Sequence, residues 1–203
     1  MKIKKLLRTI SVPLLSILIA VILGSIIIFA CGYSPLAAYS SLMKGAFGTL
    51  NSWMSTLEKC IPLVFCGLAA MVAFKSGMFN IGLEGQVVVG AIAYILVGLR
   101  VQFLPMPIHV IMCSIFAILA GGFWAVIGGA MKVYCKANEV VSTIMLNYIA
   151  LNLAEYLFSG PFMAEGTIPQ SEALDSSKLL PTIGMNSKIT WAFVIACIVV
   201  VLI

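Results

Sequence analysis

The chain has 203 residues, of which 62% are hydrophobic and 9% are charged, and its mean hydropathy is +1.15. An ordinary soluble domain is about a quarter charged, so a soluble globule of this length could not cover its exterior. The formal net charge of +5 comes from basic residues that are scattered or sit at the N-terminus, which excludes a basic face for nucleic acid. Composition therefore predicts an all-α membrane protein surrounded by a lipid bilayer.

The first predicted membrane span covers residues 11–31, a largely apolar run of 21 residues that follows a basic start, MKIKKLLRTI. At about 1.5 Å per residue, an α-helix of this length crosses the hydrocarbon core of a bilayer. A cleaved signal peptide is the alternative interpretation, but its apolar core is shorter than this run. We therefore expect an uncleaved first helix whose basic end is cytoplasmic.

Five further apolar runs complete a polytopic helical bundle of about five to six transmembrane helices; they cover residues 57–74, 81–99, 108–131, 140–158 and 190–203. With the N-terminus inside, Lys75, Lys132 and Lys136 also fall in cytoplasmic turns, as the positive-inside rule requires. The last run is shorter than the roughly 20 residues that a span needs. The chain therefore looks truncated, and we expect residues 1–203 to form a single transmembrane domain, the N-terminal portion of a longer protein.

The one long polar connection covers residues 160–188 and contains several Ser and Pro residues beside four charged ones. Alternation of the spans places it outside the cell. Such a loop is expected either to contact an external partner or to serve only as a solvated connector, and the sequence leaves both interpretations open.

Small residues recur every four positions in the run 108–131. They are Ala117, Gly121, Ala125 and Gly129. Residues at this spacing lie in one stripe along a helix, and small side chains there let two helices approach closely in lipid. We interpret the stripe as a packing feature.

Polar residues interrupt the boundary between two apolar runs in the sequence KSGMFNIGLEGQ, residues 75–86. Asn80, Glu84 and Gln86 are costly at membrane depth and usually face a cavity or a partner there. Three glycines in the same segment favour an unwound backbone, so a broken helix is predicted near residues 80–86. A short cytoplasmic turn with Glu84 near the lipid headgroups is the alternative.

A second polar motif, NEVVSTIMLNYIALNLAEY, covers residues 138–156. Asn138 is suited to cap a helix, and Glu139 in the first turn suits the positive end of the helix dipole. Thr143 and Asn147 share one helix face at a spacing of four residues. Another face carries Tyr148, Asn152 and Glu155. Lining of a pathway and hydrogen bonding between helices explain these residues equally well.

The sequence contains none of the motifs that bind nucleotides or run hydrolysis, such as a Walker A loop or a Ser-His-Asp set. His109 is its only histidine, so no histidine-based metal or catalytic site can be built, and we expect a structural or interfacial role for it. We expect a protein that is not an enzyme, has no cofactor and holds no metal. Any energy that it uses must come from another subunit.

Two motifs, FNIGLEGQ at residues 79–86 and NEVVSTIMLNYIALNL at residues 138–153, resemble permeases of nucleoside and simple-sugar ABC importers. These permeases belong to the branched-chain amino acid permease superfamily. The segment GYSPLAAYSSLMKGAFG, residues 32–48, is similar to the first external stretch of the family. The resemblance implies a multi-pass protein of the cell membrane that forms a path for nucleosides, with simple sugars as the alternative substrates.

The resemblance also implies three partners: a second, related permease, a cytoplasmic ABC ATPase and an extracytoplasmic substrate-binding lipoprotein. It implies that seven polar residues line or support the pathway; these are Asn80, Glu84, Gln86, Asn138, Glu139, Thr143 and Asn147. Family members usually carry a cytoplasmic loop with an R-A-x-G-x-N-x-x-A-A-like pattern that docks on the ATPase. This sequence does not contain that pattern.

Two other hypotheses remain open on the sequence. A self-sufficient secondary transporter would use Glu84 as a carboxylate linked to an ion or proton. A membrane fragment or assembly partner that transports nothing would explain the abrupt end at Ile203.

Overall fold

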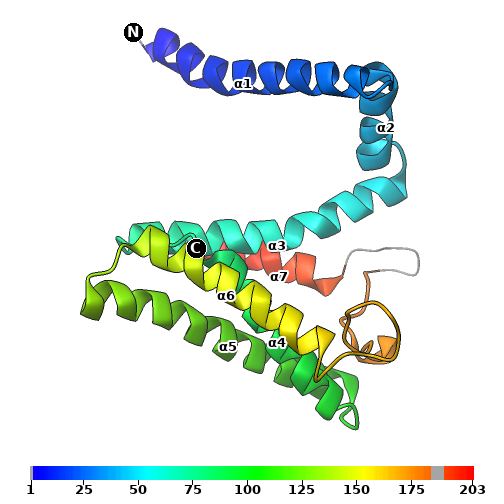
Figure 1. Cartoon of the computed structure of the whole chain (residues 1–203), viewed down its shortest axis with the longest axis vertical. Coiled ribbons are helices and arrows are strands. Elements are labelled where there is room, and N and C mark those ends of the chain that lie inside the picture. Colours follow the sequence, from blue (N-terminus) through cyan, green and yellow to red (C-terminus); the bar gives the residue numbers. More distant parts are fainter. Residues whose placement is uncertain (1, 184–189) are drawn as a thin grey trace. The chain divides into compact units, whose positions relative to one another are not determined.

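The computed structural model describes residues 2–183 and 190–203. Across these residues the regular structure is helical (Figure 1). An isolated β-bridge pairs Thr182 with Thr190. The elements are α1 (Lys2–Ala30), α2 (Pro35–Phe47), α3 (Leu50–Lys75), α4 (Leu83–Arg100), α5 (Met106–Cys135), α6 (Glu139–Ser159), the 3-10 helix η1 (Ser176–Lys178) and α7 (Trp191–Leu202). The predicted all-α class is confirmed.

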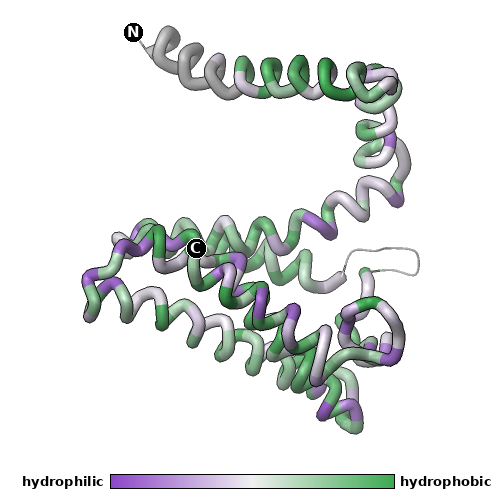
Figure 2. Tube along the Cα trace, viewed as in Figure 1, coloured by the Kyte–Doolittle hydropathy of each residue, from purple (hydrophilic) through white to green (hydrophobic). Residues whose placement is uncertain are grey.

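Four described helices, α3 to α6, are long and apolar enough to cross a membrane. The part of α1 from Leu14 onward and α2 are bent by 118° relative to each other, and they make a fifth span if the bent pair is counted as one span. α7 is apolar but shorter. Hydrophilic residues lie mostly near helix ends and connections, and along α6 they also recur between hydrophobic ones (Figure 2). The polytopic bundle predicted from composition is therefore confirmed.

The chain divides into two compact units, residues 1–57 and 58–203. In the first unit, α1 ends before Gly32, whose φ of +83° suits glycine. Ser34 then caps α2, and Pro35 occupies its first turn, where a missing N–H costs nothing. The Tyr39 hydroxyl donates to the carbonyl oxygen of Val21 at 2.9 Å, which ties α2 back to α1.

In the second unit, α4, α5 and α6 pack against one another. α4 and α5 approach closely because glycines face backbone: a Cβ on Gly90 would lie 3.2 Å from the Ala117 carbonyl oxygen. The buried apolar side chains are few, with Cys113 and Ala150 fully enclosed. Large apolar side chains point outward instead, as Leu119 does at 63% exposure, which suits contact with lipid.

The long connection after α6 folds back toward the junction of α4 and α5. Asp175 caps η1 by accepting a hydrogen bond from the Ser177 amide at 2.9 Å. Leu174 packs on α4 so closely that a Cβ on Gly98 would lie 2.9 Å from its Cδ2 atom. Leu174 and η1 therefore pack onto the helices, whereas residues 165–170 of the loop are exposed, and the two interpretations of its role remain predictions.

Candidate functional site

The predicted break lies between α3 and α4. The helix ends at Lys75, Gly77 adopts a left-handed φ of +77°, and α4 begins at Leu83. Asn80 therefore lies in the irregular segment, whereas Glu84 and Gln86 lie in the first turns of α4. The i, i+4 stacking of Asn80 on Glu84, which a continuous helix would give, does not occur.

One side chain of α6 satisfies two backbone groups of the broken segment. Asn147 accepts a hydrogen bond from the Gly85 amide at 2.8 Å and donates its Nδ2–H to the Ile81 carbonyl oxygen at 3.1 Å. The Gly85 amide is among the donors that the start of α4 leaves without a partner in its own helix. Asn147 is only 9% exposed, so water could not replace it easily.

Thr143 and Asn80 supply two further bonds in the same place. The Thr143 hydroxyl accepts from the Ile81 amide at 3.3 Å and donates to the Glu139 carbonyl oxygen at 2.7 Å. Asn80 accepts from the Gly82 amide at 2.8 Å. All three side chains are buried. We name the set of Asn80, Thr143 and Asn147, with the backbone of residues 81–85, the polar seam.

Two glycines make the close approach in the polar seam possible. A Cβ on Gly85 would lie 2.9 Å from Asn147 Oδ1 and 3.0 Å from its Cα. A Cβ on Gly82 would lie 3.0 Å from Thr143 Cβ. Both contacts are too short for any larger residue without a shift of α6. The sequence indicates these glycines only as points of flexibility, and their packing role depends on a helix about 60 residues further along.

A salt bridge and a hydrogen bond from the same lysine stabilise the turn before α6. Lys132 Nζ lies 2.6 Å from the Glu139 carboxylate and donates to the Gly77 carbonyl oxygen at 2.7 Å. Asn138 caps α6 by accepting from the amides of Val140 and Val141, as its position in the sequence predicts. Lys132, at the end of α5, thus links the start of α6 to the α3–α4 turn, a contact that no sequence pattern indicates.

Glu84 and Gln86 lie apart from the polar seam. Glu84 is exposed in the first turn of α4 and has no hydrogen bond or ion pair among the described residues. Gln86 is half-buried and lines a groove of about 610 Å³ between α3, α4 and α5. We call it the inner groove; its lining comprises Phe65, Cys66, Ala69, Leu83, Gln86, Val87, Gly90, Ala91, Tyr94, Ala117, Ile118, Gly121 and Gly122.

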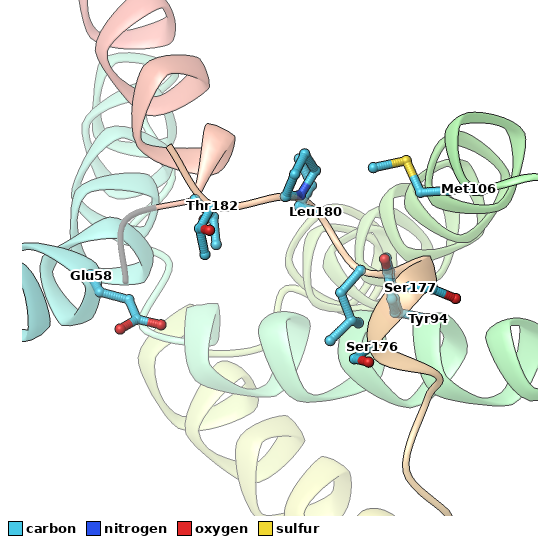
Figure 3. A pocket seen from close by; sticks show the side chains of 10 residues that line it. Glu58, Tyr94, Met106, Ser176, Ser177, Leu180 and Thr182 are labelled. Carbon is cyan, nitrogen blue, oxygen red and sulfur yellow. The ribbon is translucent and has the colours of Figure 1, made fainter. Parts of the chain in front are cut away.

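A second cavity, of about 880 Å³, lies toward the other end of α4 and is bounded by the long connection (Figure 3). We call it the outer cavity; its lining comprises Glu58, Tyr94, Met106, Ser176, Ser177, Leu179, Leu180, Pro181, Thr182 and Thr190. Hydroxyl groups and one carboxylate therefore surround a space large enough for a small solute. Tyr94 and Glu58 were not predicted, since neither belongs to a polar motif.

The small-residue stripe of α5 lies partly against α4. A Cβ on Gly121 would approach the Gln86 carbonyl oxygen to 3.0 Å, and Ala117 lies opposite Gly90. Gly129 lies nearer the α3–α4 turn, where an added Cβ would be 3.9 Å from Met78 Cε. Ala125 is half-buried. Gly128, outside the stripe, faces Thr143 of α6.

His109 is fully buried at the junction of α4 and α5. Its Nε2–H donates to the Gly98 carbonyl oxygen at 3.1 Å. That carbonyl is among the last of α4, which lack a partner within the helix. The single histidine therefore satisfies a helix end, in agreement with the structural role expected for it.

Comparison with known proteins places these features in a family context. The family model described as branched-chain amino acid transport system / permease component matches residues 52–203. The chain is 40% identical over 148 residues to the guanosine ABC transporter permease protein NupP of Bacillus subtilis, covering 73% of this chain and 42% of that protein. No solved structure matches the chain.

Two further relatives differ in what their names say they transport. The chain is 31% identical over 204 residues to the nucleoside ABC transporter permease protein NupB of Lactococcus lactis, covering 96% of this chain and 56% of that protein. It is also 31% identical over 170 residues to the glucose ABC transporter permease protein TsgB13 of Haloferax volcanii, covering 83% and 44%. The chain thus spans about half the length of these relatives.

Proposed function

The chain belongs to the branched-chain amino acid transport system permease family, and on that premise we propose that it is a permease subunit of an ABC importer that carries nucleosides across the cell membrane. The observation that carries the proposal is its similarity to a guanosine permease over nearly three quarters of its length. The similarity to a nucleoside permease covers almost the whole chain and supports the same substrate class.

The geometry of the polar seam supports a role in a translocation path. Irregular backbone at membrane depth is tolerated only where protein or a water-filled cavity satisfies its polar groups. Asn147 and Thr143 provide such partners for the start of α4. In transporters, broken helices of this kind commonly lie beside the substrate. Of the seven polar residues expected from the resemblance, five lie in or beside the polar seam, where they can support the path. Gln86 lines the inner groove, and Glu84 is exposed in the first turn of α4.

We propose a cytoplasmic N-terminus and a cytoplasmic location for the α3–α4 and α5–α6 turns. Lys75, Lys132 and Lys136 lie in or beside these turns, whereas Arg100 ends α4 on the other side. This distribution follows the positive-inside rule. The long connection and the outer cavity then face the exterior, where substrate arrives.

Three partners complete the proposal. ATP hydrolysis takes place on a separate cytoplasmic ATPase, as expected for the permease subunit of an ABC importer; these 203 residues contain no P-loop. A second, related permease forms the other side of the path, and an extracytoplasmic binding lipoprotein delivers the substrate. Differential binding to the inward and outward states then moves the substrate.

Uptake of labelled guanosine tests the proposal. Cells in which the gene is deleted should lose ATP-dependent guanosine uptake, and the gene restored in its natural genomic context should recover it. Normal guanosine uptake by the deletion strain would contradict the nucleoside assignment, provided that no second system carries guanosine in that strain.

A monosaccharide is the second candidate substrate, since the chain is similar to a glucose permease over 83% of its length. Competition distinguishes the two candidates in the restored cells. Excess unlabelled adenosine or inosine should inhibit guanosine uptake, whereas excess glucose should not. Inhibition by glucose alone would favour the sugar permease.

A further inference from the structure

The outer cavity and the inner groove share one lining residue, Tyr94. The two spaces lie along the same helix, α4, and Tyr94 is the only residue that belongs to both linings among the described residues. A solute that passes from one space to the other therefore passes this side chain.

The inner groove follows one face of α4. Its α4 residues, Leu83, Gln86, Val87, Gly90, Ala91 and Tyr94, recur at the spacing of a single helix face. From Leu83 to Tyr94 this face extends over roughly 16 Å, about half of a bilayer's hydrocarbon core. Gly90 of α4 and Gly121 of α5 have no side chains, so nothing projects into the groove at these two positions. The groove thus extends from the first turn of α4 to Tyr94, which also lines the outer cavity.

The two spaces differ in chemistry. The outer cavity presents hydroxyl groups from the long connection, at Ser176 and Ser177, and the carboxylate of Glu58 on α3 (Figure 3). The inner groove is apolar except at Gln86 and Tyr94. A nucleoside matches this division, since its ribose carries hydroxyl groups and its base is a flat ring with an apolar face. Tyrosine suits the junction because it offers a ring face and a hydroxyl group.

The hydroxyl group of Tyr94 has no hydrogen-bond partner among the described residues, and the side chain is half-buried. Met106, from the start of α5, lies in the same wall of the outer cavity and supplies a flexible apolar neighbour (Figure 3). The hydroxyl group is therefore available to a solute, and the side chain lines both spaces.

We propose that the outer cavity and the inner groove form one route along α4, and that Tyr94 is the residue that contacts the base of a nucleoside at their junction. The inference rests on the proposed function, since it takes a nucleoside as the substrate. It adds a route and a specificity-determining residue to that function.

Variants of Tyr94 test the contact in the complete transporter. Tyr94→Ala removes the ring and should raise the half-saturating guanosine concentration about 5-fold or more, the usual effect of losing one base–aromatic stack. Tyr94→Phe keeps the ring and should change that concentration less than Tyr94→Ala does. Tyr148→Ala, on the exposed face of α6 and in neither lining, is the matched control.

Native cysteines test the route without any substitution. Cys66 lines the inner groove, whereas Cys60, two turns earlier on α3, lines a separate groove against α7. Both are half-buried. Guanosine at ten times its half-saturating concentration should slow modification of Cys66 by N-ethylmaleimide about 10-fold by occupancy alone and leave Cys60 unchanged. Mass spectrometry of the two peptides gives both rates.

The results of these experiments distinguish a failure of the proposed route from a failure of the proposed function. If the wild-type transporter takes up guanosine but the Tyr94 variants match the Tyr148 control, or if Cys66 is not protected, the route is wrong and the proposed function stands. If the wild-type transporter takes up no nucleoside, the proposed function fails and this inference fails with it. Protection of Cys66 together with the graded effect of the two Tyr94 variants supports the route.

Discussion

Asn147 shows how one polar residue can hold a break in a membrane helix. Its side-chain amide accepts a hydrogen bond from the Gly85 N–H and donates one to the Ile81 carbonyl oxygen. Both backbone groups belong to a segment more than 60 positions earlier in the chain. Each backbone group would cost about 1–3 kcal/mol if it were left unsatisfied in a buried site. A residue that looked like a candidate pathway lining thus acts first as a support for backbone.

Asn147→Ala should destabilise the protein by about 1–3 kcal/mol for each backbone group that loses its partner. Asn152→Ala is the control, because Asn152 is exposed and its Nδ2–H donates only to the Tyr148 carbonyl of its own helix. Thermal unfolding of the purified protein in detergent measures both. Equal melting temperatures for the two variants would show that the polar seam contributes nothing specific.

The sequence identifies the residue types of the polar seam but not its contacts. Asn80, Thr143 and Asn147 are recognisable because a polar side chain in an apolar run is costly. That Asn147 faces Gly85 follows only from the packing of α6 on α4, which periodicity does not specify. Tyr94 could not be identified, since one tyrosine in an apolar span is as consistent with packing as with a solute contact.

Among the elements, α4 and α5 show how closely helices can approach in lipid. Gly121→Ala would place a Cβ 3.0 Å from the Gln86 carbonyl oxygen, so the two helices must separate. We expect destabilisation of about 1–3 kcal/mol, as for overpacking in other cores. Gly122→Ala, its neighbour, meets nothing within 4 Å and should be neutral or stabilising by up to about 1 kcal/mol.

Melting temperatures of the two glycine variants show whether α4 and α5 are in close contact at Gly121. Comparable stability of Gly121→Ala and Gly122→Ala would mean that the helices are not in close contact at this position. The small-residue stripe would then need another explanation.

The ends of α5 and α6 are joined by an ion pair that is only partly shielded. The side chains of Lys132 and Glu139 are 36% and 24% exposed, so solvent screens the pair. A double-mutant cycle with Lys132→Met and Glu139→Gln, followed by thermal unfolding, should give changes in melting temperature that nearly add. A strongly non-additive double variant would show that the ion pair is a major determinant of stability.

The spans could be predicted well because length and hydropathy set them directly. The boundaries of α4 to α6 fall within a few residues of the predicted runs. α2 was not predicted as a separate helix, since Gly32 and the Ser34 cap create a sharp bend that apolar composition does not reveal. The break before α4 was predicted, but placed too far into the helix, because glycine also serves close packing.

At the scale of the whole molecule, composition determines the fold class, and the charge distribution predicts the orientation. We expect a tag inserted in the α5–α6 turn, after Lys136, to be accessible only from the cytoplasm. A tag inserted near Gly166 in the long connection, where φ is +145°, should be accessible from outside. Labelling of intact cells with an impermeant reagent distinguishes the two, and the reverse pattern would overturn the orientation.

We propose that this chain forms a passive path for nucleosides that an ATPase drives. Reconstitution of the complete transporter in liposomes, with the binding protein and labelled guanosine on one side and ATP on the other, tests it most directly. We expect guanosine to accumulate against its gradient only when hydrolysable ATP is present. Accumulation driven by an ion or proton gradient without nucleotide would contradict it and would favour a secondary transporter.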